Sequence, residues 1–114
     1  MQGDEAIAVP SGQAVQLIEV IHAAPGPGGL TVRFRFLAPG IARQGGSVGP
    51  EAAQADMAHL CHVYALPRLA GPAVSQIVIS LADRVVPFGA ADPEATQFFE
   101  AFRVDGDACI WEPF

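Results

Sequence analysis

The fold of this chain is decided by residues 30–37, which read Leu30-Thr31-Val32-Arg33-Phe34-Arg35-Phe36-Leu37. Large apolar residues alternate with threonine and arginine, and a period of two predicts a strand with one apolar and one polar face. The apolar face must be buried, so we expect a sheet that is covered on one side. Arg33 and Arg35 are expected on the other side, where they can pair across the sheet with Glu100 or Glu112.

A helix supplies the expected cover. Pro50 and Glu51 suit a first helical turn, and Pro67 disfavours a helical residue before it, so the helix should end near Leu66. The helix has apolar residues at helical spacing along one face, which is the face expected to lie on the sheet. This stripe consists of Ala53, Met57, Leu60, Cys61 and Tyr64.

Four further segments are predicted as strands: residues 14–22, 74–83, 97–104 and 108–112. The loops between elements fall at 23–29, 38–50 and 84–96, which are rich in glycine and proline. Residues 97–104 also fit a helix, but Asp105-Gly106 is a hairpin signal and favours the strand. We therefore predict a flexible N-terminal tail over 1–13 and a single α+β domain over 14–114. Its order is ββαβββ, with an antiparallel sheet of about five strands and one main helix packed on one face.

Composition excludes several classes of function. The 114-residue chain has a net charge of -6, and all six of its basic residues are arginines, which excludes P-loop chemistry and lysine catalysis. The acidic balance argues against nucleic-acid binding, and no run approaches the length of a transmembrane segment. With 51% hydrophobic residues, the chain is expected to keep apolar side chains at its surface, where they mark a partner or a cleft.

The two cysteines bear on the compartment. Cys61 falls on the apolar stripe of the helix and Cys109 on the last strand, so a disulfide between them would join the helix to the sheet. Such a bond indicates an oxidising compartment and an exported protein whose signal peptide has been removed, with Gln2 as its first mature residue. The alternative is a pair of buried free thiols in a cytoplasmic protein.

The helix also carries a candidate metal site. Asp56, His59 and His62 recur every three residues, away from the apolar stripe, and imidazole with carboxylate suits zinc or copper. The alternative is that the two histidines are simply solvated, and no cofactor is expected.

The loop 83–96 is the candidate interaction site, because it is long, polar and held between rigid elements. It supplies charges and one aromatic ring, from Asp83, Arg84, Phe88, Asp92 and Glu94. The alternative is a structural loop with Phe88 packed back onto the core.

The last eighteen residues contain a cluster of aromatic side chains: Phe98, Phe99, Phe102, Trp111 and Phe114. In a hairpin, Phe98 and Phe102 share one face and Phe99 lies on the other. A sheet with a helix on one side only has an open face, where an aromatic ring suits a partner. Core packing is the alternative for the cluster.

The chain resembles a family of small exported alphaproteobacterial proteins of unknown function. The resemblance covers most of the chain: residues 33–36, 56–61, 79–84, 86–89, 92–103 and 108–112. It implies export to the periplasm and pairing of the two cysteines, and it carries no catalytic residue.

These observations lead to one expected function and two alternatives. We expect a non-enzymatic periplasmic module that binds another protein, such as an accessory subunit of a larger membrane-associated assembly; an edge strand also allows a homo-oligomer. The alternative is a periplasmic protein that binds a small ligand or a metal. A small enzyme without a recognisable motif is a third and less favoured interpretation.

Overall fold

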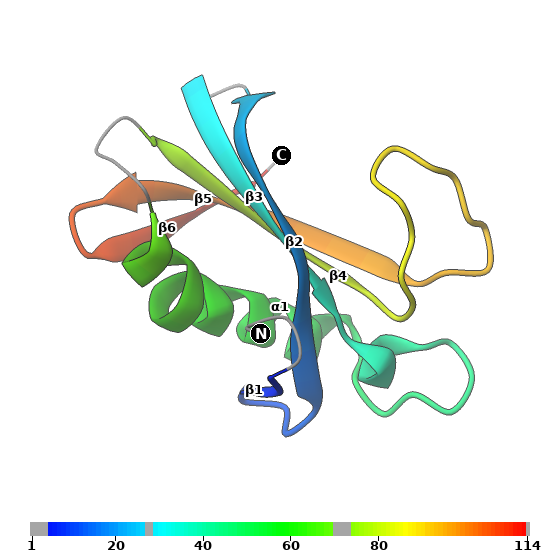
Figure 1. Cartoon of the computed structure of the whole chain (residues 1–114). Helices are drawn as coiled ribbons and strands as arrows, with labels where there is room; N and C mark the ends of the chain where they lie inside the picture. The colour runs from blue at the N-terminus through cyan, green and yellow to red at the C-terminus, as the bar shows by residue number, and fades with distance from the viewer. Residues whose placement is uncertain (1–4, 27–28, 70–73, 114) are drawn as a thin grey trace.

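The computed structural model describes residues 5–26, 29–69 and 74–113. Their strands form one six-stranded sheet in chain order, β1-β2-β3-β4-β5-β6 (Figure 1). The strands are β1 (Ile7–Ala8), β2 (Ala14–Gly26), β3 (Gly29–Leu37), β4 (Gln76–Ala82), β5 (Gln97–Asp105) and β6 (Ala108–Glu112). The predicted α+β class and single domain are therefore confirmed.

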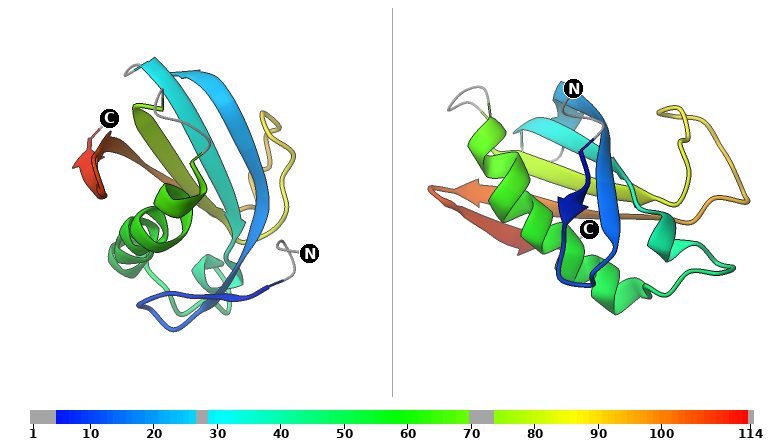
Figure 2. Two further views of the ribbon diagram at one scale, coloured as in Figure 1. Left: turned by 60° about the vertical axis from the view of Figure 1, so that its left-hand side comes forward. Right: turned by 60° about the horizontal axis from the view of Figure 1, so that its bottom comes forward.

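One helical segment covers one face of this sheet (Figure 2). Helix α1 (Pro50–Leu60) continues into the π-helical turn η3 (Cys61–Ala65) and the 3₁₀ turn η4 (Leu66–Arg68). All five residues of the predicted apolar stripe are buried. None of the helices in the described parts of the chain has the length and apolar character needed to cross a membrane.

The sheet is mixed, and the prediction of an antiparallel sheet was wrong at one junction. Strands β3 and β4 pair in parallel, whereas the other neighbouring strands are antiparallel. The helical segment connects these two strands and carries the chain back along the sheet, so β4 starts at the end where β3 started. The sixth strand is the short β1, which was not predicted.

The core lies between the helix and the apolar side of the sheet. Phe34 and Phe36 of β3 point toward the helix, and each packs edge-on against Tyr64, with ring centroids 6.3 and 5.6 Å away. Ile79 of β4 and Phe102 of β5 are buried beside them. The alternation in residues 30–37 thus selects the buried face as predicted.

The β2–β3 hairpin extends further toward its turn than predicted. Strand β2 runs to Gly26 and pairs there with Gly29, so most of the predicted loop 23–29 is strand; Pro27 and Gly28 lie outside the described residues. Residues 97–104 form a strand, as favoured, and Gly106 in the β5–β6 turn has a φ of 60°, which glycine adopts readily.

Residues 1–13 were predicted to be a flexible tail, and residues 1–4 lie outside the described part. Beyond them, Ile7 pairs with Val15, and Val9 is buried. The side chain of Asp56, wholly buried on α1, accepts hydrogen bonds from the backbone N–H and hydroxyl of Ser11 and from the amide of Gln13. The segment before β2 is therefore fixed to the helix by a buried carboxylate.

Candidate binding surface

The face of the sheet opposite α1, here called the helix-free face, is set by the strand register. Arg33 of β3 lies beside Val78 of β4, which lies beside Ala101 of β5; Arg35, Ser80 and Phe99 follow one step along. The exposure of the side chains varies across this face. Val78 and Ala101 are buried, whereas Phe99 is 53% exposed and Ile110 of β6 is 39% exposed.

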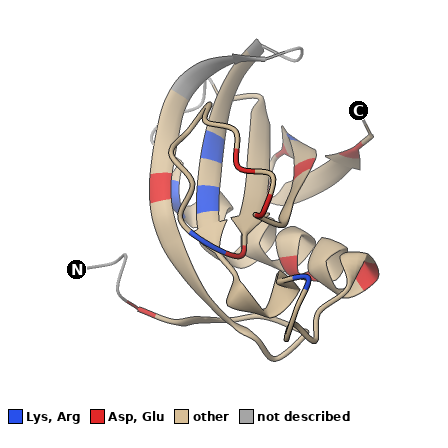
Figure 3. Ribbon diagram, turned by 90° about the vertical axis from the view of Figure 1, so that its right-hand side faces the viewer, with Lys and Arg blue, Asp and Glu red and all other residues tan. Residues whose placement is uncertain are grey.

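The loop 83–96 crosses part of this face, on the side of the sheet away from the helix (Figure 3). Val86 is buried, and its carbonyl oxygen accepts a hydrogen bond from Arg35 Nη2. The ring of Phe88 lies over both arginines, with its centroid 5.4 Å from Arg33 Cζ and 5.7 Å from Arg35 Cζ. Phe88 remains 57% exposed, so the loop anchors in the fold through Val86 and not through Phe88.

The two arginines differ in how they are neutralised. Arg35 is buried and forms an ion pair with Glu19, its neighbour on β2.

The predicted pairing of the two arginines with Glu100 or Glu112 is wrong. Glu112 is bonded instead to Gln76, and Glu100 lies on the helix side, where the indole N–H of Trp111 donates to it. Burial and the neighbouring charge of Arg35 lower the pKa of Arg33 from its ordinary value.

The loop's other predicted site residues have mainly structural roles. Asp83 accepts a hydrogen bond from the Thr96 N–H at 2.9 Å and pairs with Arg84 at 3.4 Å, which closes the base of the loop. Asp92 accepts from the N–H of Glu94 at 3.0 Å. Asp83, Arg84 and Glu94 line a hollow of about 310 Å³, whereas Phe88 faces the arginines instead.

The loop base predicts a dependence of stability on pH. Burial raises the pKa of Asp83, but the Thr96 N–H and Arg84 outweigh it, so the folded-state pKa lies below the ordinary value. The stabilisation is therefore present above the unfolded-state pKa of about 3.9 and is lost as the pH falls through the lower folded-state pKa. We expect the stability difference between wild type and Asp83→Asn to shrink below about pH 4. Urea unfolding of both proteins at successive pH values measures this difference. A stability difference that is constant with pH would contradict the assigned role of Asp83.

The predicted disulfide is present between Cys61 and Cys109, with their Cα atoms 6.3 Å apart. Cys61 is the first residue of η3 and Cys109 lies in β6, so the bond joins the end of the helix to the edge of the sheet. Both cysteines are buried. The helix is thereby held on its own face of the sheet, and the other face stays available.

The candidate metal ligands Asp56, His59 and His62 are not brought together. Asp56 is buried and occupied by Ser11 and Gln13, whereas the exposed ring of His62 accepts a hydrogen bond from the backbone N–H of Cys109 at 3.2 Å. Since Nε2 accepts, Nδ1 carries the proton and donates to the carbonyl of Ala58. Within residues 5–26, 29–69 and 74–113, no three His, Cys, Asp or Glu side chains are placed to hold a metal.

The contact of His62 predicts a structural effect of its removal. His62→Ala should lower the free energy of unfolding by about 1 kcal/mol, because the N–H of Cys109 loses its acceptor. His59→Ala is the matched control one turn earlier and should change stability by less than about 0.5 kcal/mol. Thermal unfolding of both variants in the oxidised state measures the difference, and equal losses would count against the assigned role.

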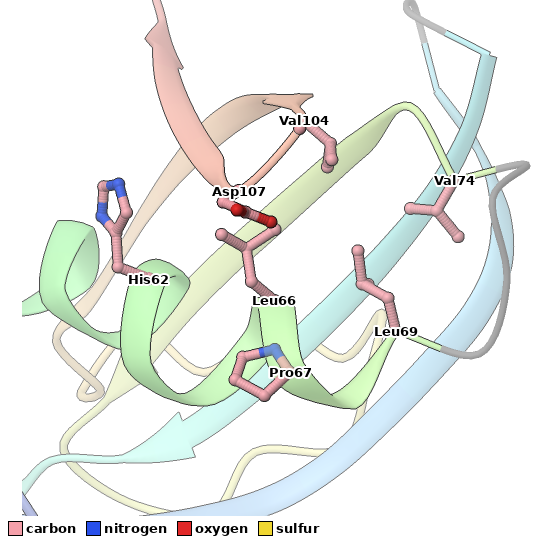
Figure 4. A pocket seen from close by; sticks show the side chains of 8 residues that line it. His62, Leu66, Pro67, Leu69, Val74, Val104 and Asp107 are labelled. Atoms are coloured by element: carbon pink, nitrogen blue, oxygen red, sulfur yellow. The ribbon is translucent and has the colours of Figure 1, made fainter.

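A hollow of about 620 Å³ lies between η4 and the β5–β6 turn (Figure 4). Its side chains are mainly aliphatic, from Leu66, Leu69, Val74 and Val104. The ring of His62 stands at one end of this hollow, apart from the side chain of Asp107 (Figure 4). A second hollow of about 400 Å³ lies on the helix side, beside Trp111, Ala55 and Ala58.

Comparison with known proteins identifies the family of this chain. A protein-family model described as a family of unknown function, DUF6497, matches residues 1–114. No curated protein and no solved structure matches the chain. The role of the surface must therefore be argued from its own geometry.

Proposed function

We propose that this chain, which belongs to the DUF6497 family of unknown function, is a non-enzymatic protein-binding module of the periplasm. Its partner would dock on the helix-free face of the sheet. An accessory subunit of a larger, membrane-associated assembly is the form of this role that we favour.

The observation that carries the proposal is the exposure of large apolar side chains on that face. Phe88, Phe99 and Ile110 are all exposed there, from the loop 83–96 and from strands β5 and β6, and we call them the apolar patch. Aromatic residues are enriched among those that dominate binding energy at protein interfaces. Buried Val78 and Ala101 lie on the same face, and the ring of Phe88 lies over Arg33, so this face combines apolar contact with a positive charge.

The proposed compartment is supported by the disulfide. A buried disulfide joining helix and sheet forms and persists in an oxidising environment, such as the bacterial periplasm. The composition supports a bacterial source with a GC-rich genome, because the chain has no lysine and no asparagine. The engaged titratable groups support a role without catalysis. Asp56, Asp83 and Glu19 each hold a structural hydrogen bond or ion pair.

Affinity purification with two matched variants tests the docking face. We expect the wild type to retain a partner from periplasmic and membrane extracts, and Phe99→Glu to retain it at least about tenfold less, because a buried charge opposes docking. Val63→Glu is the control, since Val63 is 50% exposed on the helical segment. Equal retention by both variants, or no retained partner at all, would reject the proposal.

A second candidate function is the binding of a small apolar ligand, supported by the hollow of about 620 Å³ near η4 and its aliphatic lining. Native mass spectrometry of the untagged protein distinguishes the two functions. A retained small-molecule mass that Leu66→Glu removes would favour the ligand, and a bare monomer would favour the protein partner.

A further inference from the structure

We propose that Arg33 is the charged anchor of the helix-free face and receives a carboxylate of the partner, from an aspartate or glutamate side chain, beside the ring of Phe88. This inference rests on the proposed function, since it names the chemistry that the partner must present. Its evidence comes from the difference between two arginines that stand two residues apart on one strand.

Arg35 has its charge neutralised and both of its terminal nitrogens bonded. Its Nη1 pairs with Glu19 and its Nη2 donates to the carbonyl of Val86. Its charge is thus neutralised by β2, and its orientation is fixed by the loop. Arg35 therefore serves the fold, because both of its terminal nitrogens are engaged within the chain.

Arg33 is left without such partners. Its Nε is buried and has no hydrogen-bond partner, and no carboxylate pairs with its guanidinium among the described residues. Its two terminal nitrogens also have no hydrogen bond within the described residues. Unlike Nε, they are not buried, so they reach solvent. The exposed end of the guanidinium is the fork that accepts a carboxylate through two parallel hydrogen bonds.

The surroundings of Arg33 favour an anion of a single charge. Burial removes water from the guanidinium of Arg33, and the charge of Arg35 repels it. Both effects lower the pKa of Arg33, so a bound anion would stabilise its charged form. Glu19 already neutralises Arg35, which leaves one positive charge in excess. A carboxylate matches that charge, whereas a phosphate dianion would be repelled by Glu19. The ring of Phe88 supplies an apolar wall that strengthens the ion pair by excluding water.

The test uses the oxidised full chain labelled with ¹⁵N, and it follows the Nε–H signals of the arginines by NMR. The probe is the capped peptide acetyl-Gly-Glu-Gly-amide, and the matched control is the same peptide with glutamine. We expect the glutamate peptide to shift the Arg33 signal saturably, with a dissociation constant in the millimolar range. The glutamine peptide should bind at least about tenfold more weakly, because it lacks the charge.

Two variants locate the effect. Arg33→Gln should weaken the glutamate peptide at least about tenfold. Arg103→Gln should leave the response of Arg33 intact, because Arg103 lies on the same face with its own partner Asp105 at 3.7 Å. Equal responses to the two peptides, a response unaffected by Arg33→Gln, or tighter binding of inorganic phosphate than of the glutamate peptide would overturn the proposal.

The same variants separate this inference from the proposed function. If a partner is lost in Phe99→Glu but retained by Arg33→Gln, the face binds a protein and the carboxylate assignment is wrong. If the peptide responds as expected but no protein partner is retained, the anion site stands and the proposed function fails.

Discussion

Replacing Cys61 and Cys109 together by alanine is expected to lower the free energy of unfolding by about 4 kcal/mol. The disulfide closes a loop with a sequence separation of 48 residues. On the chain-entropy model, a loop of this length restricts the unfolded chain by about 4 kcal/mol. The loss is the largest that we expect from any change discussed for this protein, because the bond joins the end of the helix to β6.

Urea unfolding of the wild type with and without reductant, and of the double variant, measures this effect. Reductant should lower the stability of the wild type by the same amount as the double substitution, and it should leave the double variant unchanged. A loss below about 1 kcal/mol in both comparisons would mean that packing alone holds the helix on the sheet.

Asp56→Ala is expected to produce the second-largest loss, about 3 kcal/mol, because a wholly buried carboxylate with three hydrogen bonds disappears. The loss should appear first in the segment before β2, since Ser11 and Gln13 lose their acceptor. Gln54→Ala is the matched control, because Gln54 is exposed on the same helix, and it should change stability by less than about 0.5 kcal/mol.

A double-mutant cycle between Asp56→Ala and Ser11→Ala isolates this contact. The combined loss should fall short of the sum of the single losses, because both changes remove the hydrogen bond from the Ser11 hydroxyl to Asp56, whereas Ser11→Ala keeps the bond from the backbone N–H. Additive losses would show that the hydroxyl contact does not contribute to the role of Asp56. Thermal unfolding and amide exchange of residues 7–13 provide the two readouts.

The disulfide and Asp56 together explain why one face of the sheet stays available. The disulfide fixes the end of the helix to β6, and Asp56 fixes the segment before β2 to the middle of the helix. Both contacts lie on the helix side. The other face is crossed only in part by the loop 83–96, and it carries the apolar patch and Arg33.

The elements that depend on local pattern were predicted correctly from the sequence. The alternation at residues 30–37 correctly places Val32, Phe34 and Phe36 in the core, although Thr31 and Arg35 on the other face are buried as well. The stripe from Ala53 to Tyr64 is buried as predicted. The signal Asp105-Gly106 fell within one residue of the β5–β6 turn, whose central residues are Gly106 and Asp107 between the paired Asp105 and Ala108.

The relations between distant residues were not predictable in this way. Periodicity does not encode strand direction, so the parallel pairing of β3 with β4 was missed. The partner of Arg35 was also missed, because the register of β2 shifts between Leu17 and Glu19 and brings Glu19 opposite Arg35. Asp56 was predicted to be a metal ligand on the surface of the helix. Local pattern does not indicate its true partners, because Ser11 and Gln13 are more than forty residues away in the sequence.

The candidate site was predicted in part. The loop 83–96 does lie at an exposed face, and Phe99 lies on the side of β5 opposite Phe98, as the hairpin register requires. The role of Arg33 had no sequence signal, since the contrast with Arg35 depends on Glu19 and Val86, which come from two other segments. Phe114 of the predicted aromatic cluster lies outside the described residues.

Site-specific photocrosslinking in intact cells tests whether a protein partner docks on the helix-free face. A photoreactive amino acid replaces Phe99 in one variant and Val63 in the other, since both side chains are about half exposed on opposite sides of the molecule. We expect one discrete crosslinked protein from position 99 and none from position 63. Crosslinking from position 63 alone, or from neither position, would contradict it.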